Sequence, residues 1–193
     1  GRVLDVMATL PREAFLPVAH RNLAYADLAL PLSHGEFTMK PVLQGRALQA
    51  LALDPADDVL VIGAGTGYLA GCAGRLARDV LALERHSDLA QAATAALSEQ
   101  SVDNVQVVVG DVFTWTTDRR FSAILVAGAV DTIPQRFIDW LEPNGRMFVV
   151  RGRSPVMEAV LVRNDVNAPR IQSLFETDLP YLAGAAPAPV FKF

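Results

Sequence analysis

The feature that most constrains the fold is a short apolar run at 59–62, followed at once by three glycines at alternate positions. The run reads Val-Leu-Val-Ile and is apolar at every position, so that both faces of the strand would be apolar, which is typical of a strand buried on both faces of a parallel sheet. Glycines allow a sharp backbone turn and the close approach of a ligand, because they carry no Cβ. Helical spacing begins at Tyr68, so the segment predicts a strand, a ligand-binding turn and a helix. The predicted turn is Gly63-Ala64-Gly65-Thr66-Gly67.

The rest of the chain continues this alternation of strands and helices. Further strands are expected at 80–83, 105–109, 123–127 and 147–150, and helices at 42–53, 68–76, 88–99 (with Ser87 as N-cap) and 134–141. This order predicts an α/β fold with a mostly parallel, doubly wound sheet and helices on both faces. Beyond residue 151, strands at 158–163 and 171–176 have a short connection and are expected to pair antiparallel. We expect the first third to be irregular outside its helix, and a last short strand at 190–193.

Composition limits the classes of protein to which the chain can belong. Its 193 residues, 51% of them hydrophobic, are enough for one domain with a substantial core. Lys and Arg number 17 against 21 Asp and Glu, and the net charge of −4 argues against nucleic acid as the main partner. The single cysteine, Cys72, rules out an intrachain disulfide and a cysteine-rich zinc site, so we expect a buried thiol and no metal.

No apolar run approaches the roughly 20 residues that a membrane span needs, and no signal peptide opens the sequence. We therefore expect a cytoplasmic protein that has no membrane partner.

Two carboxylates follow the next two predicted strands. Glu84 ends the second strand, where a carboxylate can accept hydrogen bonds from both hydroxyls of a ribose. Asp111 follows the third strand, where it can accept a hydrogen bond from an adenine amine while Val112 offers an apolar edge. Taken singly, Glu84 could instead be a solvated acid paired with Arg85 or Arg78, and Asp111 a turn residue. The carboxyl ends of parallel strands meet in one crevice, so the three signals together predict a nucleoside site.

The glycine spacing distinguishes two kinds of nucleoside cofactor. The dinucleotide pattern needs a small residue three positions after Gly65, where this chain has Tyr68. An NAD-dependent oxidoreductase is therefore disfavoured. Gly-x-Gly-x-Gly is instead typical of methyltransferases that use S-adenosylmethionine and release S-adenosylhomocysteine. The predicted cofactor-binding residues are Gly63, Ala64, Gly65, Thr66, Gly67, Glu84, Arg85, Asp111 and Val112.

Motifs outside this core resemble those of one methyltransferase family. Ahead of the core stand Pro11-Arg12-Glu13-x-Phe15-x-Pro17, Ala24-Tyr25-x-Asp27 and Leu30-Pro31-Leu32, and after it Ile133-Pro134 and Leu141-x-x-x-Gly145-Arg146. With the core, they resemble the protein-L-isoaspartate O-methyltransferase family over almost the whole chain. The resemblance implies a single Rossmann-like methyltransferase domain over 1–193. It divides this domain into a substrate-side region at 1–53, a cofactor-binding core at 54–151 and a C-terminal strand extension at 152–193.

The resemblance also implies a reaction. A methyl group would pass from S-adenosylmethionine to the free α-carboxyl of L-isoaspartyl residues in damaged proteins or peptides, and the ester would close to a succinimide that reopens partly to aspartate. A carboxylate is already ionised at neutral pH, so no general base is required and the protein's task is alignment and desolvation. Accordingly we expect no catalytic triad, and we expect His20, His34 and His86 to be solvated or structural.

One segment departs from the family pattern. The family usually has Gln-Thr-Ile-Ser-Gln-Pro where this chain has Glu-Phe-Thr-Met-Lys-Pro over 36–41. Met39 stands at the position of the serine associated with catalysis, and a thioether has no hydroxyl to donate. Thr38 is one position away, and Lys40 could hold a carboxylate by its charge. The candidates for catalysis are therefore, by position, Thr38, Met39 and Lys40, and two alternatives stay open: a methyltransferase for another acceptor, and a non-catalytic S-adenosylmethionine-binding module.

Overall fold

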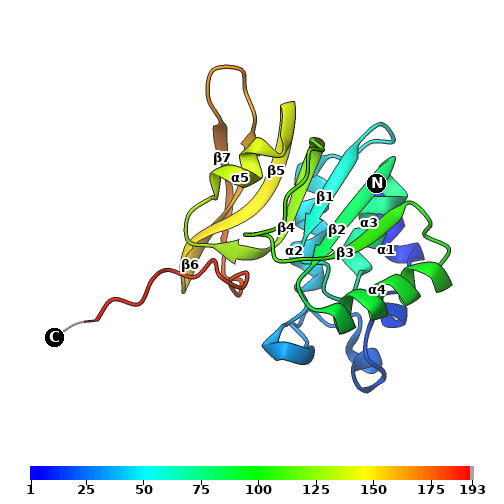
Figure 1. Ribbon diagram of the computed structural model, residues 1–193. Helices are drawn as coiled ribbons and strands as arrows, with labels where there is room; N and C mark the ends of the chain where they lie inside the picture. Colours follow the sequence, from blue (N-terminus) through cyan, green and yellow to red (C-terminus); the bar gives the residue numbers. More distant parts are fainter. Residues whose placement is uncertain (192–193) are drawn as a thin grey trace.

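The protein is organised around one seven-stranded sheet in a computed structural model that describes residues 1–191 (Figure 1). The strands are β1 (Asp58–Ile62), β2 (Asp79–Glu84), β3 (Val105–Val109), β4 (Phe121–Val130), β5 (Leu141–Arg153), β6 (Val156–Arg163) and β7 (Arg170–Thr177). Their order is β3-β2-β1-β4-β5-β6-β7, in which the strands from β3 to β5 run parallel. β6 and β7 are antiparallel to their neighbours, which confirms the predicted mixed sheet with an antiparallel extension.

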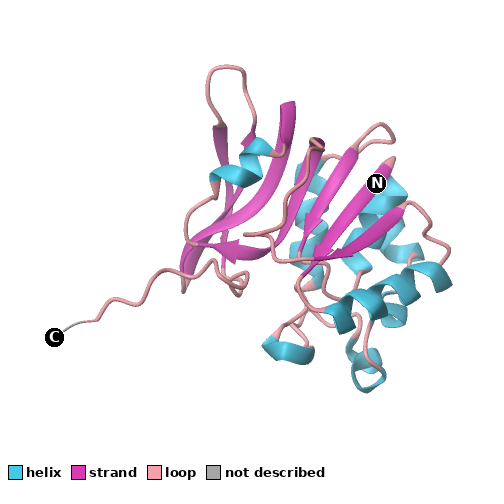
Figure 2. Ribbon diagram, in the orientation of Figure 1, coloured by secondary structure: helices cyan, strands magenta, loops and turns pink. Residues whose placement is uncertain are grey.

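Helices cover both faces of this sheet (Figure 2). They are α1 (Arg2–Thr9), α2 (Pro41–Leu51), α3 (Tyr68–Leu76), α4 (Ser87–Glu99) and α5 (Gln135–Asp139), with 3-10 helices η1 (Arg12–Phe15), η2 (Val18–Leu23) and η3 (Ser33–Gly35). Side chains of β1 alternate between the two faces. Val59 and Val61 join a core with α2, α3 and α4, whereas Leu60 and Ile62 join a second core that includes Phe137 of α5. Among the described residues, no helix is long and apolar enough to cross a membrane.

Several predicted bounds of helices and strands were wrong in the region of β4, α5 and β5. β4 extends well beyond the predicted 123–127 in both directions, because it lies between β1 and β5 and is buried along most of its length. The helix predicted at 134–141 is shorter, since Leu141 already pairs with Phe121 in β5. β5 extends beyond the predicted 147–150 in both directions and includes Asn144 and Gly145, near which the register with β4 shifts.

Three other parts of the chain also differ from expectation: the N-terminal segment, the start of α4 and the C-terminal segment. The first third contains the amphipathic helix α1, whose Val6 and Met7 pack against the main core. Ser87 is the first residue of α4 rather than its N-cap, which is His86. The strand predicted at 190–193 is not formed at residues 190 and 191, and residues 192–193 lie outside the described part.

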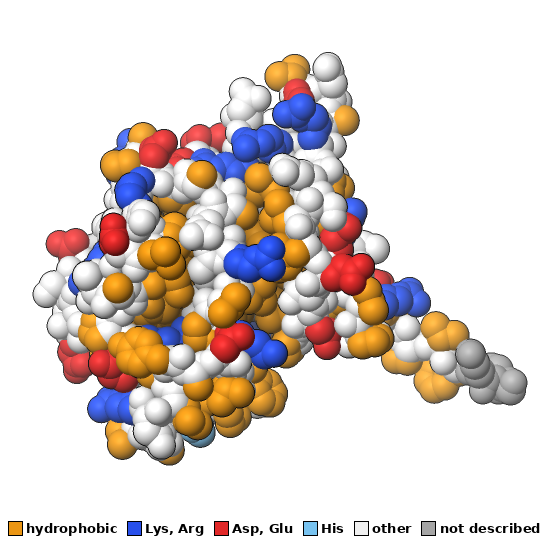
Figure 3. All heavy atoms as spheres, turned by 180° about the vertical axis from the view of Figure 1, so that it is seen from behind, with side chains coloured by type: hydrophobic (Ala, Val, Ile, Leu, Met, Phe, Trp, Pro, Cys, Tyr) orange, Lys and Arg blue, Asp and Glu red, His pale blue; other side chains and the backbone are white. Residues whose placement is uncertain are grey.

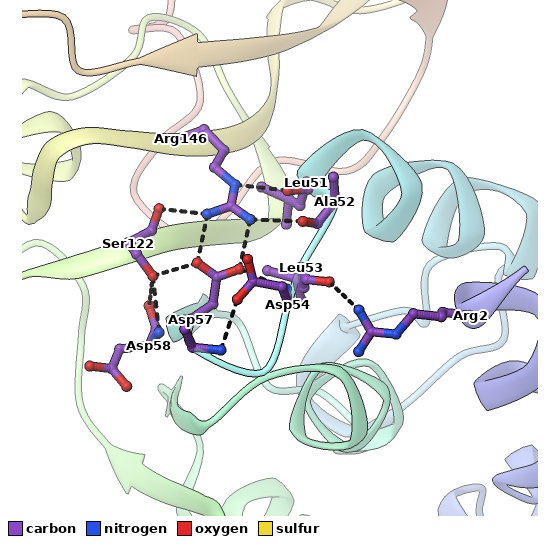
Figure 4. Close-up of polar contacts among 10 residues, drawn as sticks. Arg2, Leu51, Ala52, Leu53, Asp54, Asp57, Asp58, Ser122 and Arg146 are labelled. Atoms are coloured by element: carbon purple, nitrogen blue, oxygen red, sulfur yellow. Dashed lines mark hydrogen bonds and ion pairs between the residues drawn. The ribbon is translucent and has the colours of Figure 1, made fainter.

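A buried ion pair joins several elements at the amino ends of the parallel strands (Figure 4). Arg146 of β5 binds both carboxylate oxygens of Asp57, with Nη1 to Oδ1 at 2.7 Å and Nη2 to Oδ2 at 2.8 Å. Its Nε donates to the carbonyl of Leu51 at the end of α2, and the Ser122 hydroxyl of β4 donates to Asp57 Oδ1. Burial would raise the pKa of Asp57, but the hydrogen bonds from Arg146, Asp54 and Ser122 lower it to about 2.

Cys72 lies on α3 and is fully buried, as predicted. Burial raises the pKa of its thiol to about 12, so the thiolate does not form at neutral pH. Cys72 is therefore a core residue.

Candidate functional site

The main cleft lies at the carboxyl ends of β1, β2, β3 and β4, the edge of a doubly wound sheet at which ligands bind. Its walls come from six separate segments of the chain. They are Leu32 with Gly35–Thr38, Ile62 with Gly63 and Gly65, Leu83–Arg85, Gly110–Val112, Ala127 with Gly128, and residues 179–183.

The glycine turn is held in a left-handed conformation that suits glycine. Gly63, Gly65 and Gly67 have φ angles of +89°, +54° and +89°, which residues with a Cβ rarely adopt. Gly65 faces open space, so a ligand can approach its backbone. Gly67 has a different role, because a Cβ there would lie 2.9 Å from the Cβ of Ala93 on α4. The first two glycines therefore line the cleft, whereas the third allows two helices to pack closely.

Glu84 is a buried carboxylate at the base of the cleft and is only 5% exposed. The backbone N–H of Gly65 donates to its Oε1 and that of His86 to its Oε2, each at 2.9 Å. A carboxylate oxygen can accept about two hydrogen bonds, so each oxygen keeps one acceptor position for a ligand. The alternative pairing with Arg78 is wrong, because Arg78 pairs with Asp58 instead.

Asp111 and Val112 form the part of the cleft wall that follows β3. Asp111 Oδ1 accepts the backbone N–H of Phe113 at 2.9 Å, which fixes the carboxylate in a tight turn. Val112 is buried and faces the cleft. The backbone N–H of Gly110 donates to the carbonyl of Glu84 at 2.8 Å, so the two carboxylate-bearing strand ends are joined directly.

The structure brings most of the predicted cofactor-binding residues to this cleft. Those that line it are Gly63, Gly65, Glu84, Arg85, Asp111 and Val112. The other three belong to the same turn but do not line the cleft. Ala64 is in the core, the Thr66 hydroxyl accepts the backbone N–H of Tyr68, and Gly67 contacts α4.

Residues 27–42 form two antiparallel arms beside the cleft, which we call the entrance hairpin. The arms are joined by backbone hydrogen bonds from Thr38 to Leu30 and from Leu32 to Glu36, and by a bridge between Pro31 and Phe37. The turn between them is η3. The departure from the family pattern lies within this segment. Four further residues of it line the cleft and were not predicted: Leu32, Gly35, Glu36 and Phe37.

The three positional candidates of the entrance hairpin point in different directions. Thr38 lines the cleft, and its Oγ1 accepts the backbone N–H of Leu30 at 2.9 Å. Met39 is 4% exposed and packs in the core, while its carbonyl accepts a hydrogen bond from Arg12 Nη2 at 3.2 Å. Lys40 is exposed at the start of α2 and does not line the cleft. Residue 39 thus packs in the core, whereas residue 38 lines the cleft.

A pair of stacked histidines fastens the entrance hairpin to α4. The rings of His34 and His86 are parallel within 2°, with centroids 4.0 Å apart. The carboxylate of Asp88 on α4 makes two further contacts with the turn of the hairpin. His34 Nε2 lies 2.8 Å from its Oδ1, and the Ser33 hydroxyl donates to its Oδ2 at 3.0 Å. The hydrogen bond with His34 lowers the pKa of Asp88. His34 and His86 therefore have a structural role at the rim of the cleft.

The segment after β7 forms the wall that sequence analysis missed. Its backbone follows β4, with Ala129 N–H donating to the Pro180 carbonyl and Leu182 N–H to the Ala129 carbonyl, both at 2.9 Å. The leucine side chain lies over Gly128, where a Cβ would come within 2.6 Å of Leu182 Cδ2. A glycine inside a strand indicates such a close approach. Its presence does not reveal which distant segment approaches.

Within residues 1–191, no group of three or more His, Cys, Asp or Glu side chains is placed to hold a metal ion.

Comparisons with known proteins agree on one family. The model of the protein-L-isoaspartate(D-aspartate) O-methyltransferase family matches residues 1–175. A protein-L-isoaspartate O-methyltransferase of Koribacter versatilis is 40% identical over 162 residues, which are 83% of this chain and 72% of the relative. One from Roseiflexus castenholzii is 35% identical over 96% of this chain and 86% of its own length.

A solved structure shows the same fold. A protein-L-isoaspartate O-methyltransferase of Plasmodium falciparum, crystallised with S-adenosyl-L-homocysteine, superposes with a TM-score of 0.83. The match covers 94% of this chain and 89% of that one at 20% identity, so it supports the architecture.

Proposed function

The chain belongs to the protein-L-isoaspartate(D-aspartate) O-methyltransferase family, and we propose that it methylates the free α-carboxyl of L-isoaspartyl residues with S-adenosylmethionine. The observation that carries this proposal is the position of Thr38. Thr38 lines the same cleft as Glu84 and Asp111, so one cleft offers both a nucleoside site and a hydroxyl-bearing residue for an acceptor carboxylate.

The residues of the cleft fit the cofactor. Glu84 is the informative one, because it is buried and each of its two oxygens accepts only one hydrogen bond, from a backbone N–H group. Its free acceptor positions suit the two hydroxyls of a ribose, while Asp111 and Val112 suit an adenine. The open space at Gly65 leaves room for the methionine part. When bound, S-adenosylmethionine supplies a methyl group activated by a positive sulfur.

Thr38 holds the acceptor carboxylate in this proposal. The Thr38 hydroxyl accepts one hydrogen bond from the backbone of Leu30, and among the described residues no acceptor is placed for its own proton. It can therefore donate that proton to a substrate carboxylate. No residue needs to remove a proton, because the carboxylate is ionised at neutral pH. The walls of the cleft exclude water and align the carboxylate for in-line attack.

Other parts of the proposal follow from the family. Residues 1–53 serve the substrate side, 54–151 the cofactor and 152–193 the outer strands. The acceptor is an isoaspartyl residue within a protein or peptide, and its ester closes to a succinimide without further help. We place the protein in the cytoplasm, where such repair needs neither a membrane nor a disulfide.

A paired-peptide assay tests the function. The protein is incubated with methyl-labelled S-adenosylmethionine and an isoaspartyl peptide, beside the same peptide with ordinary aspartate. We expect label on the isoaspartyl peptide only, in a base-labile ester. Calorimetry with S-adenosylhomocysteine is run in parallel. Binding of this product without transfer would contradict the isoaspartyl acceptor, and absence of binding would contradict the methyltransferase itself.

A further inference from the structure

Three large apolar side chains of the entrance hairpin are exposed to solvent. Leu28 is 46% exposed, Phe37 50% and Val42 59%. Single exposed apolar residues are common on protein surfaces, but several on one short segment indicate an interaction site. Hydrophobic side chains also gather over the lower part of the face in Figure 3, the end of the molecule at which η2 and η3 lie in Figure 1.

Backbone contacts hold the segment that carries these three side chains in place. Asp27, next to Leu28, accepts the backbone N–H of Val42 at 3.1 Å, so the two ends of the hairpin are joined. Phe37 is bridged to Pro31 on the opposite arm. The turn is fastened to α4 by the stacked histidines. The three side chains are therefore presented by a segment that is held at its ends, middle and turn.

The entrance hairpin also forms part of the wall of the cleft. Phe37 lines the cleft while remaining half exposed, and Thr38 follows it directly. A polypeptide acceptor continues on both sides of the reacting residue. Its neighbouring residues cannot all enter a cleft that also holds the cofactor, so they must lie on the surface beside it. Phe37 stands at the border between the cleft and this surface, because it lines the cleft and is half exposed.

We infer that Leu28, Phe37 and Val42 form a docking surface, the apolar ledge, for apolar side chains that flank the methyl-acceptor residue of a polypeptide substrate. This inference rests on the proposed function. It makes the enzyme selective for isoaspartyl residues in apolar sequence contexts. A second copy of the chain is a poorer occupant, because stable protein interfaces bury on the order of 1,200 Å² or more, which exceeds what three side chains supply.

The experiment compares two isoaspartyl peptides that differ only in the residues beside the acceptor, which are Leu in one and Ser in the other. The wild type is expected to show a KM about tenfold lower for the Leu-flanked peptide, because removing apolar surface from water favours the bound state. The double variant L28S/V42S is expected to lose most of this preference while kcat is retained. Phe37 is left unchanged, since it also lines the cleft.

Val166→Ser is the matched control. Val166 is 84% exposed and lies in the connection between β6 and β7, outside the cleft. This variant is expected to keep the wild-type preference. Binding of both peptides to the complex with S-adenosylhomocysteine is measured by calorimetry, so discrimination is recorded whether or not methyl transfer occurs.

The outcomes separate the two proposals. Equal affinity of the wild type for the two peptides, or an unchanged preference in L28S/V42S, overturns the apolar ledge. Tight binding of the Leu-flanked peptide without any methyl transfer overturns the proposed function and leaves the ledge standing. A wild-type dimer in sedimentation that L28S/V42S dissociates would assign the surface to a second copy and also overturn the inference.

Discussion

The backbone N–H of Gly65 donates a hydrogen bond to the carboxylate of Glu84 at 2.9 Å, and this contact joins the turn after β1 to the end of β2. A residue proposed to bind the cofactor thus also holds the loop that faces the cofactor. Removing the side chain would affect both, whereas an amide could keep the acceptor oxygen. Glu84 therefore allows the two contributions to be separated.

The first prediction concerns this carboxylate. Glu84→Ala is expected to weaken binding of S-adenosylhomocysteine by a hundredfold or more, because hydrogen bonds to a charged group contribute about 1.5–3 kcal/mol each. Glu84→Gln keeps one acceptor oxygen and is expected to lose less. Calorimetry measures both affinities, and thermal unfolding shows whether the loop has lost stability. Equal affinities for wild type and Glu84→Ala would contradict a ribose contact.

The second prediction concerns the hydroxyl at position 38. Thr38→Val has nearly the same shape but cannot donate to an acceptor carboxylate, so kcat/KM for the isoaspartyl peptide is expected to fall by roughly 10- to 100-fold. Thr38→Ser keeps the hydroxyl and is expected to retain most of the activity. Affinity for S-adenosylhomocysteine serves as the control and should stay close to wild type in both variants. Full activity of Thr38→Val would exclude this hydroxyl from the reaction.

The third prediction concerns the departure from the family pattern. Restoring serine with Met39→Ser is not expected to raise activity, because residue 39 is buried and packs in the main core. Loss of a buried methionine is expected to lower the free energy of unfolding by about 2–5 kcal/mol. Denaturant unfolding and the peptide assay check the two parts. A gain of isoaspartyl activity would show that residue 39 reaches the cleft in the working enzyme.

Much of the parallel core could be predicted from the sequence, since four of its five strands, β1, β2, β4 and β5, contain a continuous apolar run. The same holds for the cleft residues that immediately follow these strands, such as Glu84 and Asp111. Their position depends only on the rule that parallel strands end at one edge.

The remaining walls depend on contacts between distant segments. Nothing local indicates that Leu182 lies over Gly128, or that Thr38 lines the cleft while its neighbour Met39 packs in the core. The direction of side chains in the entrance hairpin is set by its pairing and by the Arg12 contact to the Met39 carbonyl, which periodicity does not predict.

The fourth prediction concerns acid stability. Asp57 has a pKa of about 2 in the folded protein, below its ordinary value of 3.8, so its ionised form is favoured by folding. This contribution is fully present above about pH 4 and is lost as the pH falls towards 2, and it amounts to at most about 2 kcal/mol. Asp57→Asn is expected to be less stable than wild type at pH 7 and to show a smaller loss of stability between pH 5 and 2.

Arg146→Lys is the companion variant for this ion pair. It keeps the charge but loses the two parallel hydrogen bonds to Asp57 and the contact with Leu51, so it is expected to destabilise the protein at neutral pH. Urea unfolding at several pH values provides the measurement. Identical pH profiles for wild type and Asp57→Asn would show that other carboxylates control the acid transition.

The fifth prediction concerns the wall formed after β7. Gly128→Ala would place a Cβ 2.6 Å from Leu182 Cδ2 and 3.1 Å from the backbone nitrogen of the same residue. The segment at 179–183 must then move away from β4, and affinity for S-adenosylhomocysteine is expected to fall. Leu182→Ala removes the nearer contact, so the double variant is expected to recover part of the loss, because the two sites share one contact and are not additive. Calorimetry on the four proteins of this cycle measures the coupling; independent effects of the two changes would place the segment away from Gly128 in solution.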